Sequence, residues 1–166
     1  AEAAIAKDNS PRAYVRFVPE RKDDLAWEND KVAFRVYGPA LRDGPEDSGI
    51  DAWTKKVAHP VINKWYRLDL AGQQSYHEDH GEGLDAFKVG DSRGCGAPGL
   101  WSDGKLITPD VYQYASIFWT GPDVAEFHAA YRYPLRHDNR PIYEHRTIRL
   151  RLGERLCEVE LKFNTS

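Results

Sequence analysis

The sequence predicts an all-β protein, an antiparallel β-sandwich, on three observations. Apolar and polar residues alternate with a period of two over at least five segments, the pattern of strands that bury one face. No long amphipathic helix is evident, since the nearest candidate, residues 47–57, contains Gly49 and scattered apolar positions. Residues 38–110 are rich in Gly, Pro, Asp and His and predict a long irregular region within the β framework.

Strands are expected where the alternation is clearest. In chain order, these segments are residues 32–37, 112–120, 127–133, 148–152 and 157–163. The second segment ends at Gly121-Pro122, and the last two flank Gly153-Glu154-Arg155, which predicts a hairpin turn. His128 lies opposite the apolar face of its strand, so we expect its ring to point to water.

Length and charge narrow the class of protein. The 166 residues fit a single domain, residues 1–166, with a flexible N-terminal segment over residues 1–12. A formal net charge of −3 argues against nucleic acid as a partner, because nucleic acid usually selects a basic face. No run of about 18 apolar residues is present, so no membrane span is expected.

Both ends of the sequence predict an incomplete domain. The chain contains no Met, so Ala1 is not expected to be the native translation start. An amphipathic last strand at residues 157–163 would leave a long open sheet edge unless another segment paired with it. We therefore expect part of a larger domain, completed by the rest of its own longer chain or by a homo-oligomer.

The two cysteines, Cys95 and Cys157, form no C-x-x-C motif, which excludes a zinc ribbon or a thioredoxin-like site. Free thiols are favoured over a disulfide, since unpaired cysteines are commonly buried. Cys157 shares a strand face with Val159 and Leu161, and we expect it to be buried and reduced.

Residues 76–85 hold the densest group of ionisable side chains. Imidazole and carboxylate are the usual proton-transfer groups near neutral pH. Three interpretations stay open: a solvated acidic loop, an active-site loop, and a divalent-metal site using both imidazoles and an acid, although the loop matches no EF-hand. The group consists of His77, Glu78, Asp79, His80, Glu82 and Asp85.

A second motif, residues 63–67, combines cations with aromatic rings. Lys64 and Arg67 would neutralise a uronate carboxylate, and the Trp65 ring would stack on a sugar face. The alternative is an ordinary mixed strand.

Residues 93–99 contain a literal G-x-G-x-x-G. Pro98 and Gly99 oppose the helix start that a dinucleotide site needs, so we expect a tight turn that holds Arg93.

Several ungapped segments of the chain resemble one family. They are residues 16–24, 27–30, 34–40, 61–66, 77–83 and 93–96. They resemble a bacterial domain-of-unknown-function family from polysaccharide-utilisation gene clusters, associated with an ulvan-oligosaccharide dehydratase. The resemblance covers roughly residues 12–164 and implies export to the periplasm or the medium. Residues 27–38 are also similar to the first core strand of β-supersandwich, mutarotase-like carbohydrate enzymes.

With this resemblance, we expect a carbohydrate-active enzyme that eliminates water or a glycosidic leaving group from uronate-containing oligosaccharides. The reaction needs a base for the C5 proton, a group that stabilises the enolate, and a general acid for the leaving oxygen. The expected roles are base for His77 or His80, acid or base for Tyr66, carboxylate binding for Lys64 and Arg93, and orientation of an imidazole for Asp79 or Glu82.

Two alternatives remain at this stage. One is a non-catalytic carbohydrate-binding or structural β-sandwich module, and the other is a mutarotase-like epimerase. Convergence of His77, His80, Lys64 and Arg93 in one cleft favours an enzyme, whereas scattered positions favour the binding module.

Overall fold

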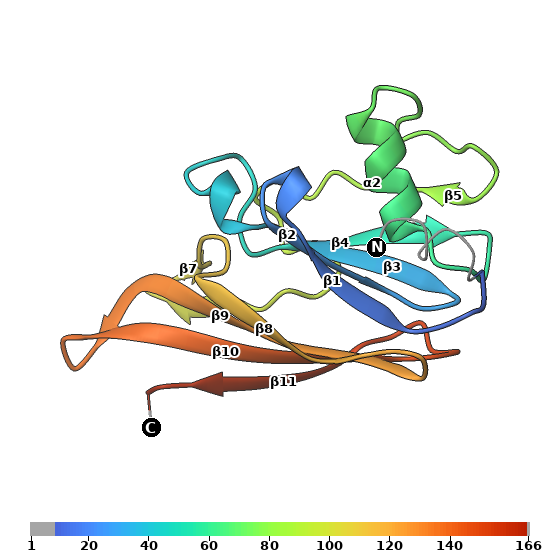
Figure 1. Ribbon diagram of the computed structural model, residues 1–166. Coiled ribbons are helices and arrows are strands. Elements are labelled where there is room, and N and C mark those ends of the chain that lie inside the picture. The colour runs from blue at the N-terminus through green and yellow to red at the C-terminus, as the bar shows by residue number, and fades with distance from the viewer. Residues whose placement is uncertain (1–8, 166) are drawn as a thin grey trace.

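The computed structural model describes residues 9–165 and confirms the all-β sandwich. A five-stranded antiparallel sheet, called here the first sheet, has the order β1-β2-β3-β4-β5. A four-stranded antiparallel sheet, the second sheet, has the order β11-β10-β9-β8 and lies across it (Figure 1). A small hairpin, β6–β7, projects from one end. The expected flexible segment 1–12 falls mostly outside the described residues.

The bounds of the elements follow the chain. In the first sheet they are β1 Tyr14–Val18, β2 Asp24–Glu28, β3 Val32–Val36, β4 Ile50–Lys55 and β5 Gly83–Leu84. In the second they are β8 Tyr114–Thr120, β9 Val124–His137, β10 Arg140–Arg151 and β11 Glu158–Phe163. The remaining elements are β6 Leu100–Ser102, β7 Lys105–Ile107, the 3-10 turns η1 Pro19–Arg21 and η2 Pro39–Leu41, and the helix α2 Ile62–Leu70.

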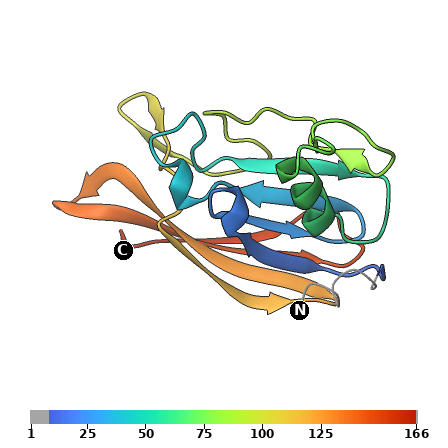
Figure 2. The same ribbon diagram turned by 45° about the horizontal axis from the view of Figure 1, so that its top comes forward.

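The first sheet is covered on both faces, which makes the molecule three layers deep. The second sheet packs on one face, while α2 and the loop after it lie on the other (Figure 2). All five residues of β2 are buried for this reason. No helix in the described part of the chain has the length and apolar character needed to cross a membrane.

Helix α2 corrects the interpretation of residues 63–67 as a mixed strand. Ile62, Trp65 and Tyr66 have the i, i+3, i+4 spacing of one helix face, and all three are buried. The carboxylate of Glu28, on β2, accepts hydrogen bonds from the backbone N–H groups of Val61 and Ile62 at 2.9–3.0 Å. A strand carboxylate thus fixes the start of the helix, where the orphan N–H groups and the helix dipole favour negative charge.

The weak helix candidate at residues 47–57 is also corrected, since it contains β4. Gly153-Glu154-Arg155 lies, as predicted, in the loop between β10 and β11. Both cysteines are free thiols. Cys157 is half-buried against the inter-sheet core rather than fully buried.

Trp27 is the centre of the core between the two sheets. Its ring stacks on Phe34, with ring centroids 5.4 Å apart, and meets Phe127 of the second sheet at 4.8 Å. Its indole N–H points at the sulfur of Cys157, 3.4 Å away. One buried side chain therefore contacts β3, β9 and the start of the last strand segment.

Replacing Trp27 by Ala is expected to lower the free energy of unfolding by about 3–5 kcal/mol, because it empties the centre of the inter-sheet core. Urea unfolding measures the loss. The control is Leu156→Ala, since Leu156 is 83% exposed and its truncation is expected to change stability by less than about 0.5 kcal/mol. Equal losses in the two variants would contradict the assignment of Trp27 as the core centre.

Candidate functional site

Beneath α2, the outer face of the first sheet holds a buried group of charges. Arg35 of β3 is 3% exposed and donates to the Asp51 carboxylate at 2.6 Å, to the Asp85 carboxylate at 3.0 Å and to the Tyr76 hydroxyl at 3.1 Å. Asp24 lies beside it, 3.8 Å from the guanidinium. Arg35 is thus surrounded by three buried carboxylates, which lie between the first sheet and the His77–His80 loop.

Asp85 connects this buried group to the surface. Its carboxylate lies 3.4 Å from Nδ1 of His77, whose side chain is more than half exposed. Burial, together with the nearby negative charge of Asp51, raises the pKa of Asp85 to about 6, although Arg35 opposes the shift. The acid that contacts His77 is therefore Asp85, and neither Asp79 nor Glu82, which the sequence predicted to orient an imidazole of this loop.

Asp79 and Glu82 instead hold the loop in shape. The Asp79 carboxylate accepts from the backbone N–H groups of Gly81 and Gly83 and pairs with Lys56. Gly83 has φ of 118°, and a Cβ there would lie 2.0 Å from the Thr54 carbonyl oxygen, so only glycine fits. The Asp79 side chain therefore closes a tight turn against β4.

Glu82 is the centre of a second set of contacts. It accepts from Lys64 at 2.9 Å and from the Trp65 indole at 3.1 Å, and it lies 3.0 Å from Nε2 of His59. Burial opposes ionisation, but these partners outweigh it and lower the pKa of Glu82 to about 2. Lys64 and Glu82 are thus already paired with each other.

The aromatic residues predicted for this site are buried. Tyr66 is fully buried, with its hydroxyl 3.5 Å from Asp24, and burial raises its pKa well above the ordinary value. Trp65 is 7% exposed and stacks on Trp53. Trp65 therefore offers no face to a sugar, and Tyr66 no accessible hydroxyl.

Arg93 lies at a different place on the first sheet. The neighbouring Gly94 bridges to Ile50 at the start of β4, whereas Gly83 pairs with Lys55 at its end. Five residues of extended strand separate the two positions by about 16 Å. Arg93 itself is paired with Asp47 at 2.9 Å. The tight turn expected here is present, but it does not bring Arg93 to the His loop.

The hollow beside His80, Lys64 and Glu82 measures only about 20 Å³, room for about one water and not for a sugar ring. Within residues 9–165, no three His, Cys, Asp or Glu side chains gather closely enough to hold a metal ion. A larger cavity of about 610 Å³ opens between the sheets, with a mostly apolar lining that includes none of the predicted site residues. His77, His80, Lys64 and Arg93 therefore do not converge in one cleft.

A second candidate site lies on the outer face of the second sheet. Ile117 pairs with Phe127 and Trp119 with Glu126, so a β-bulge at Phe118 places two consecutive side chains opposite one residue. Phe118 and Trp119 therefore both point outward. With Tyr114 they form what we call the aromatic row, and each of the three is more than half exposed.

Two histidines line the aromatic row on the neighbouring strands. The His128 ring stacks on Phe118, with ring centroids 6.3 Å apart, and is tilted against Tyr114, with ring centroids 5.5 Å apart. Its Nε2 lies 3.1 Å from Nδ1 of His145, on β10. Burial and the second imidazole lower the pKa of His128. His128 is thus half-buried among rings rather than free in water as predicted.

The chain belongs to the family described as "Domain of unknown function (DUF4861)", whose model matches residues 3–166. It is 45% identical over 130 residues to "Uncharacterized protein P7" from Formosa agariphila. That match covers 73% of this chain and 33% of the relative, so the chain spans about a third of the relative's length. No solved structure matches the chain.

Replacing Glu82 by Gln is expected to destabilise the fold at neutral pH, and less so in acid. The native carboxyl has a pKa of about 2, below its ordinary value of 4.5. The contribution of this carboxyl to the free energy of unfolding is therefore fully present above about pH 5 and is lost as the pH falls toward about 2. Urea unfolding of both proteins at several pH values measures the difference.

The control for this experiment is Glu78→Gln, since the Glu78 side chain is 75% exposed. This variant is expected to follow the parent at every pH. A Glu82→Gln deficit that stays constant between neutral pH and about pH 3 would contradict the assignment.

Proposed function

We propose that this domain binds carbohydrate on the outer face of its second sheet. The observation that carries the proposal is the aromatic row of Tyr114, Phe118 and Trp119. Contiguous exposed apolar patches mark binding surfaces, whereas single exposed apolar residues are ordinary. A pyranose ring presents an apolar face of C–H bonds, which packs on a flat aromatic side chain, and its hydroxyls hydrogen-bond to neighbouring polar groups.

The arrangement of the row supports this ligand class. The three rings lie along one strand with the imidazoles of His128 and His145 beside them, so apolar faces alternate with groups that donate and accept hydrogen bonds. The strand is part of a hydrogen-bonded sheet, which holds the rings in place before the ligand arrives.

The resemblance to a family from polysaccharide-utilisation gene clusters, associated with an ulvan-oligosaccharide dehydratase, supports the same ligand class. We accordingly place the protein in the periplasm or outside the cell, where polysaccharides are degraded. In a longer protein, this surface would hold the oligosaccharide substrate, with the rest of its own chain or a second copy completing the domain.

Trp119→Ala is expected to weaken oligosaccharide binding by about thirtyfold, since truncating a central aromatic contact typically costs about 2 kcal/mol. Phe118→Ala is expected to act in the same direction. Titration calorimetry with neutral, uronate-containing and sulfated oligosaccharides measures the affinities.

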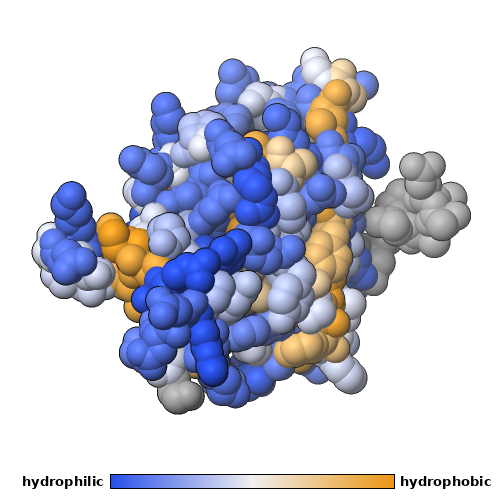
Figure 3. Space-filling view, turned by 90° about the vertical axis from the view of Figure 1, so that its left-hand side faces the viewer, coloured by the Kyte–Doolittle hydropathy of each residue, from blue (hydrophilic) through white to orange (hydrophobic). Residues whose placement is uncertain are grey.

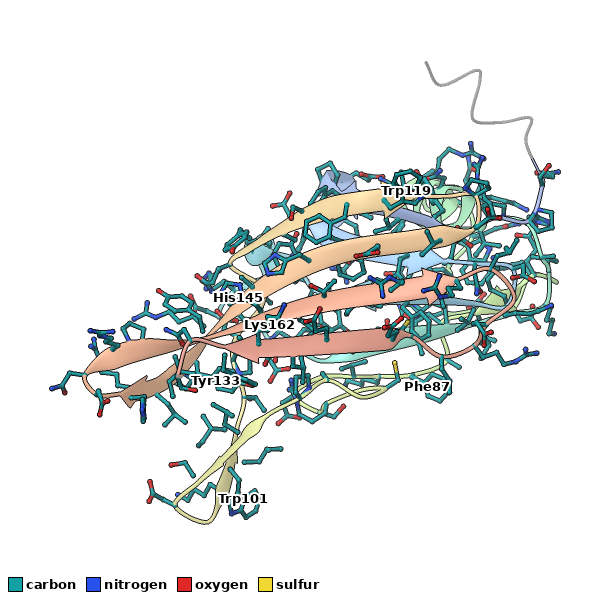
Figure 4. All side chains as sticks on the ribbon, turned by 90° about the horizontal axis from the view of Figure 1, so that it is seen from below. Phe87, Trp101, Trp119, Tyr133, His145 and Lys162 are labelled. Atoms are coloured by element: carbon teal, nitrogen blue, oxygen red, sulfur yellow. The ribbon has the colours of Figure 1, made fainter. Side chains whose placement is uncertain are left out.

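The matched control is Trp101→Ala, because Trp101 is 73% exposed on the small hairpin, away from the aromatic row (Figure 4). This variant is expected to bind like the parent. Equal losses for Trp101 and Trp119, or no binding of any saccharide by the parent, would refute the proposal.

A second candidate function is the elimination reaction, and the contact between His77 and Asp85 favours it. In this proposal His77 removes the C5 proton of a uronate, the C4–O bond breaks as the C4–C5 double bond forms, and the leaving oxygen takes a proton from water. Asp85 stabilises the imidazolium that forms on His77. Asp85 is in turn fixed by Arg35 at 3.0 Å. His80, 38% exposed at the same loop, is the alternative base.

His77→Ala is expected to lower kcat for uronate elimination by about 10²–10⁴-fold, the usual contribution of a general base. Asp85→Asn is expected to lower it less and to shift its pH profile. The ultraviolet absorbance of the unsaturated product follows the reaction. Glu78→Ala is the control, and rates that are unchanged in both the His77 and His80 variants would remove this candidate.

A further inference from the structure

A cleft lined by arginines lies at the end of the second sheet, where β9 runs past the start of β8. The β8–β9 ladder begins with Tyr114 opposite Ala130, so beyond that pair the edge of β9 that faces away from β10 has no strand neighbour among residues 9–165. A hollow of about 390 Å³ lies along this edge, within the range of ligand sites. Its charged and polar lining is Arg42, Arg132, Arg136, Asp110, Gln113 and Thr108.

The charges of this arginine cleft do not balance. Arg42 pairs with Asp110 at 3.0 Å. Arg136 donates to the Asn139 carbonyl oxygen at 2.7 Å, and Arg132 has no side-chain partner within the part of the chain that the structure describes. Among the described residues, neither of these two guanidinium groups has a carboxylate partner. Two positive charges therefore face the cleft uncompensated, in a protein whose net charge is −3.

The geometry points to a bound anion: we propose that the arginine cleft receives an acidic substituent, a carboxylate or a sulfate ester, of the carbohydrate that lies on the aromatic row. Guanidinium groups bind such oxyanions through two parallel N–H···O bonds, with shorter and stronger hydrogen bonds than neutral donors make. Figure 3 looks onto this end of the molecule, where hydrophilic residues cover most of the surface.

The position of the cleft ties it to the aromatic row. Gln113, in the cleft, directly precedes Tyr114, and Gln113 also donates its backbone N–H to Ala130 at 2.7 Å. Arg132 lies four residues after His128, so it shares the outward face of β9 and stands about 13 Å along it. One oligosaccharide can therefore contact the rings and the arginines together. This inference rests on the proposed carbohydrate binding.

The test compares a double variant, Arg132→Gln with Arg136→Gln, with Arg155→Gln. Arg155 is an exposed arginine of the loop between β10 and β11, at the other end of the second sheet, with no side-chain partner among the described residues. Titration calorimetry uses oligogalacturonides, sulfated galactan oligosaccharides and a neutral galactan. The parent is expected to bind at least one acidic ligand about tenfold or more tightly than the neutral one, with a marked salt dependence.

The double variant is expected to lose that preference and to keep its affinity for the neutral ligand, while Arg155→Gln keeps both. Loss for oligogalacturonides alone assigns the site to a carboxylate, and loss for the sulfated ligand alone assigns it to a sulfate ester. An acidic preference that survives in the double variant overturns the inference and leaves the proposed function standing.

Inorganic sulfate separates failure of the cleft from failure of the aromatic row. If no saccharide binds the parent, the proposed function fails, and the cleft is judged by sulfate alone. Sulfate is then expected to raise the melting temperature of the parent and of Arg155→Gln more than that of the double variant. Because sulfate also stabilises proteins non-specifically, equal increases in all three proteins overturn the inference.

Discussion

The guanidinium of Arg35 is sealed from water and joins two layers of the molecule. It bonds to Asp51 on the neighbouring strand and to Tyr76 and Asp85 of the loop that follows α2. Removing one partner of a buried ion pair leaves an uncompensated charge and typically costs about 3–5 kcal/mol. Tyr76 and Asp85 are also the two ends of the His-containing loop, so the shape of that loop depends on a residue of β3.

The burial of Arg35 with Tyr76 and Asp85 also explains the shape of the His-containing loop. Both ends are buried under α2, and the segment between them is exposed, with Asp79 and Glu82 turned back onto Lys56 and Lys64. Carboxylates that look free for chemistry in the sequence are thus largely used to hold the loop. Within this loop, His77 combines an exposed ring with a buried acid behind it.

The alternating strands were predictable because one face of the second sheet is open to solvent. Residues 127–133 and 148–152 show the period of two that such a sheet imposes; the first segment lies in β9, and the second lies in β10 up to Arg151. β2 gave no such signal, because both of its faces are covered and it places Asp24 and Glu28 inside. Helix α2 was missed because it has only three buried positions in nine residues, two of them aromatic.

The candidate sites were predictable only in part, for a similar reason. The sequence places His77 among several acids, but three-dimensional pairing decides that Asp85 is its neighbour. Strand β8 was expected, yet the outward direction of both Phe118 and Trp119 depends on a bulge, which is defined by the register with β9. The cations expected at the sugar site are neutralised by neighbouring carboxylates, Lys64 by Glu82 and Arg93 by Asp47. In contrast, no sequence motif indicated a role for Arg132.

The bulge at Phe118 also determines how this surface can change in evolution. Ile117 faces the core, and Thr120 bonds back to Val15 of the first sheet, so both must keep their inward direction. Deleting Phe118 would restore simple alternation, with Ile117 in, Trp119 out and Thr120 in. A one-residue insertion or deletion at this point therefore adds or removes one ring from the exposed face while the core keeps its register. Relatives can vary the length of their aromatic surface here without repacking the sandwich.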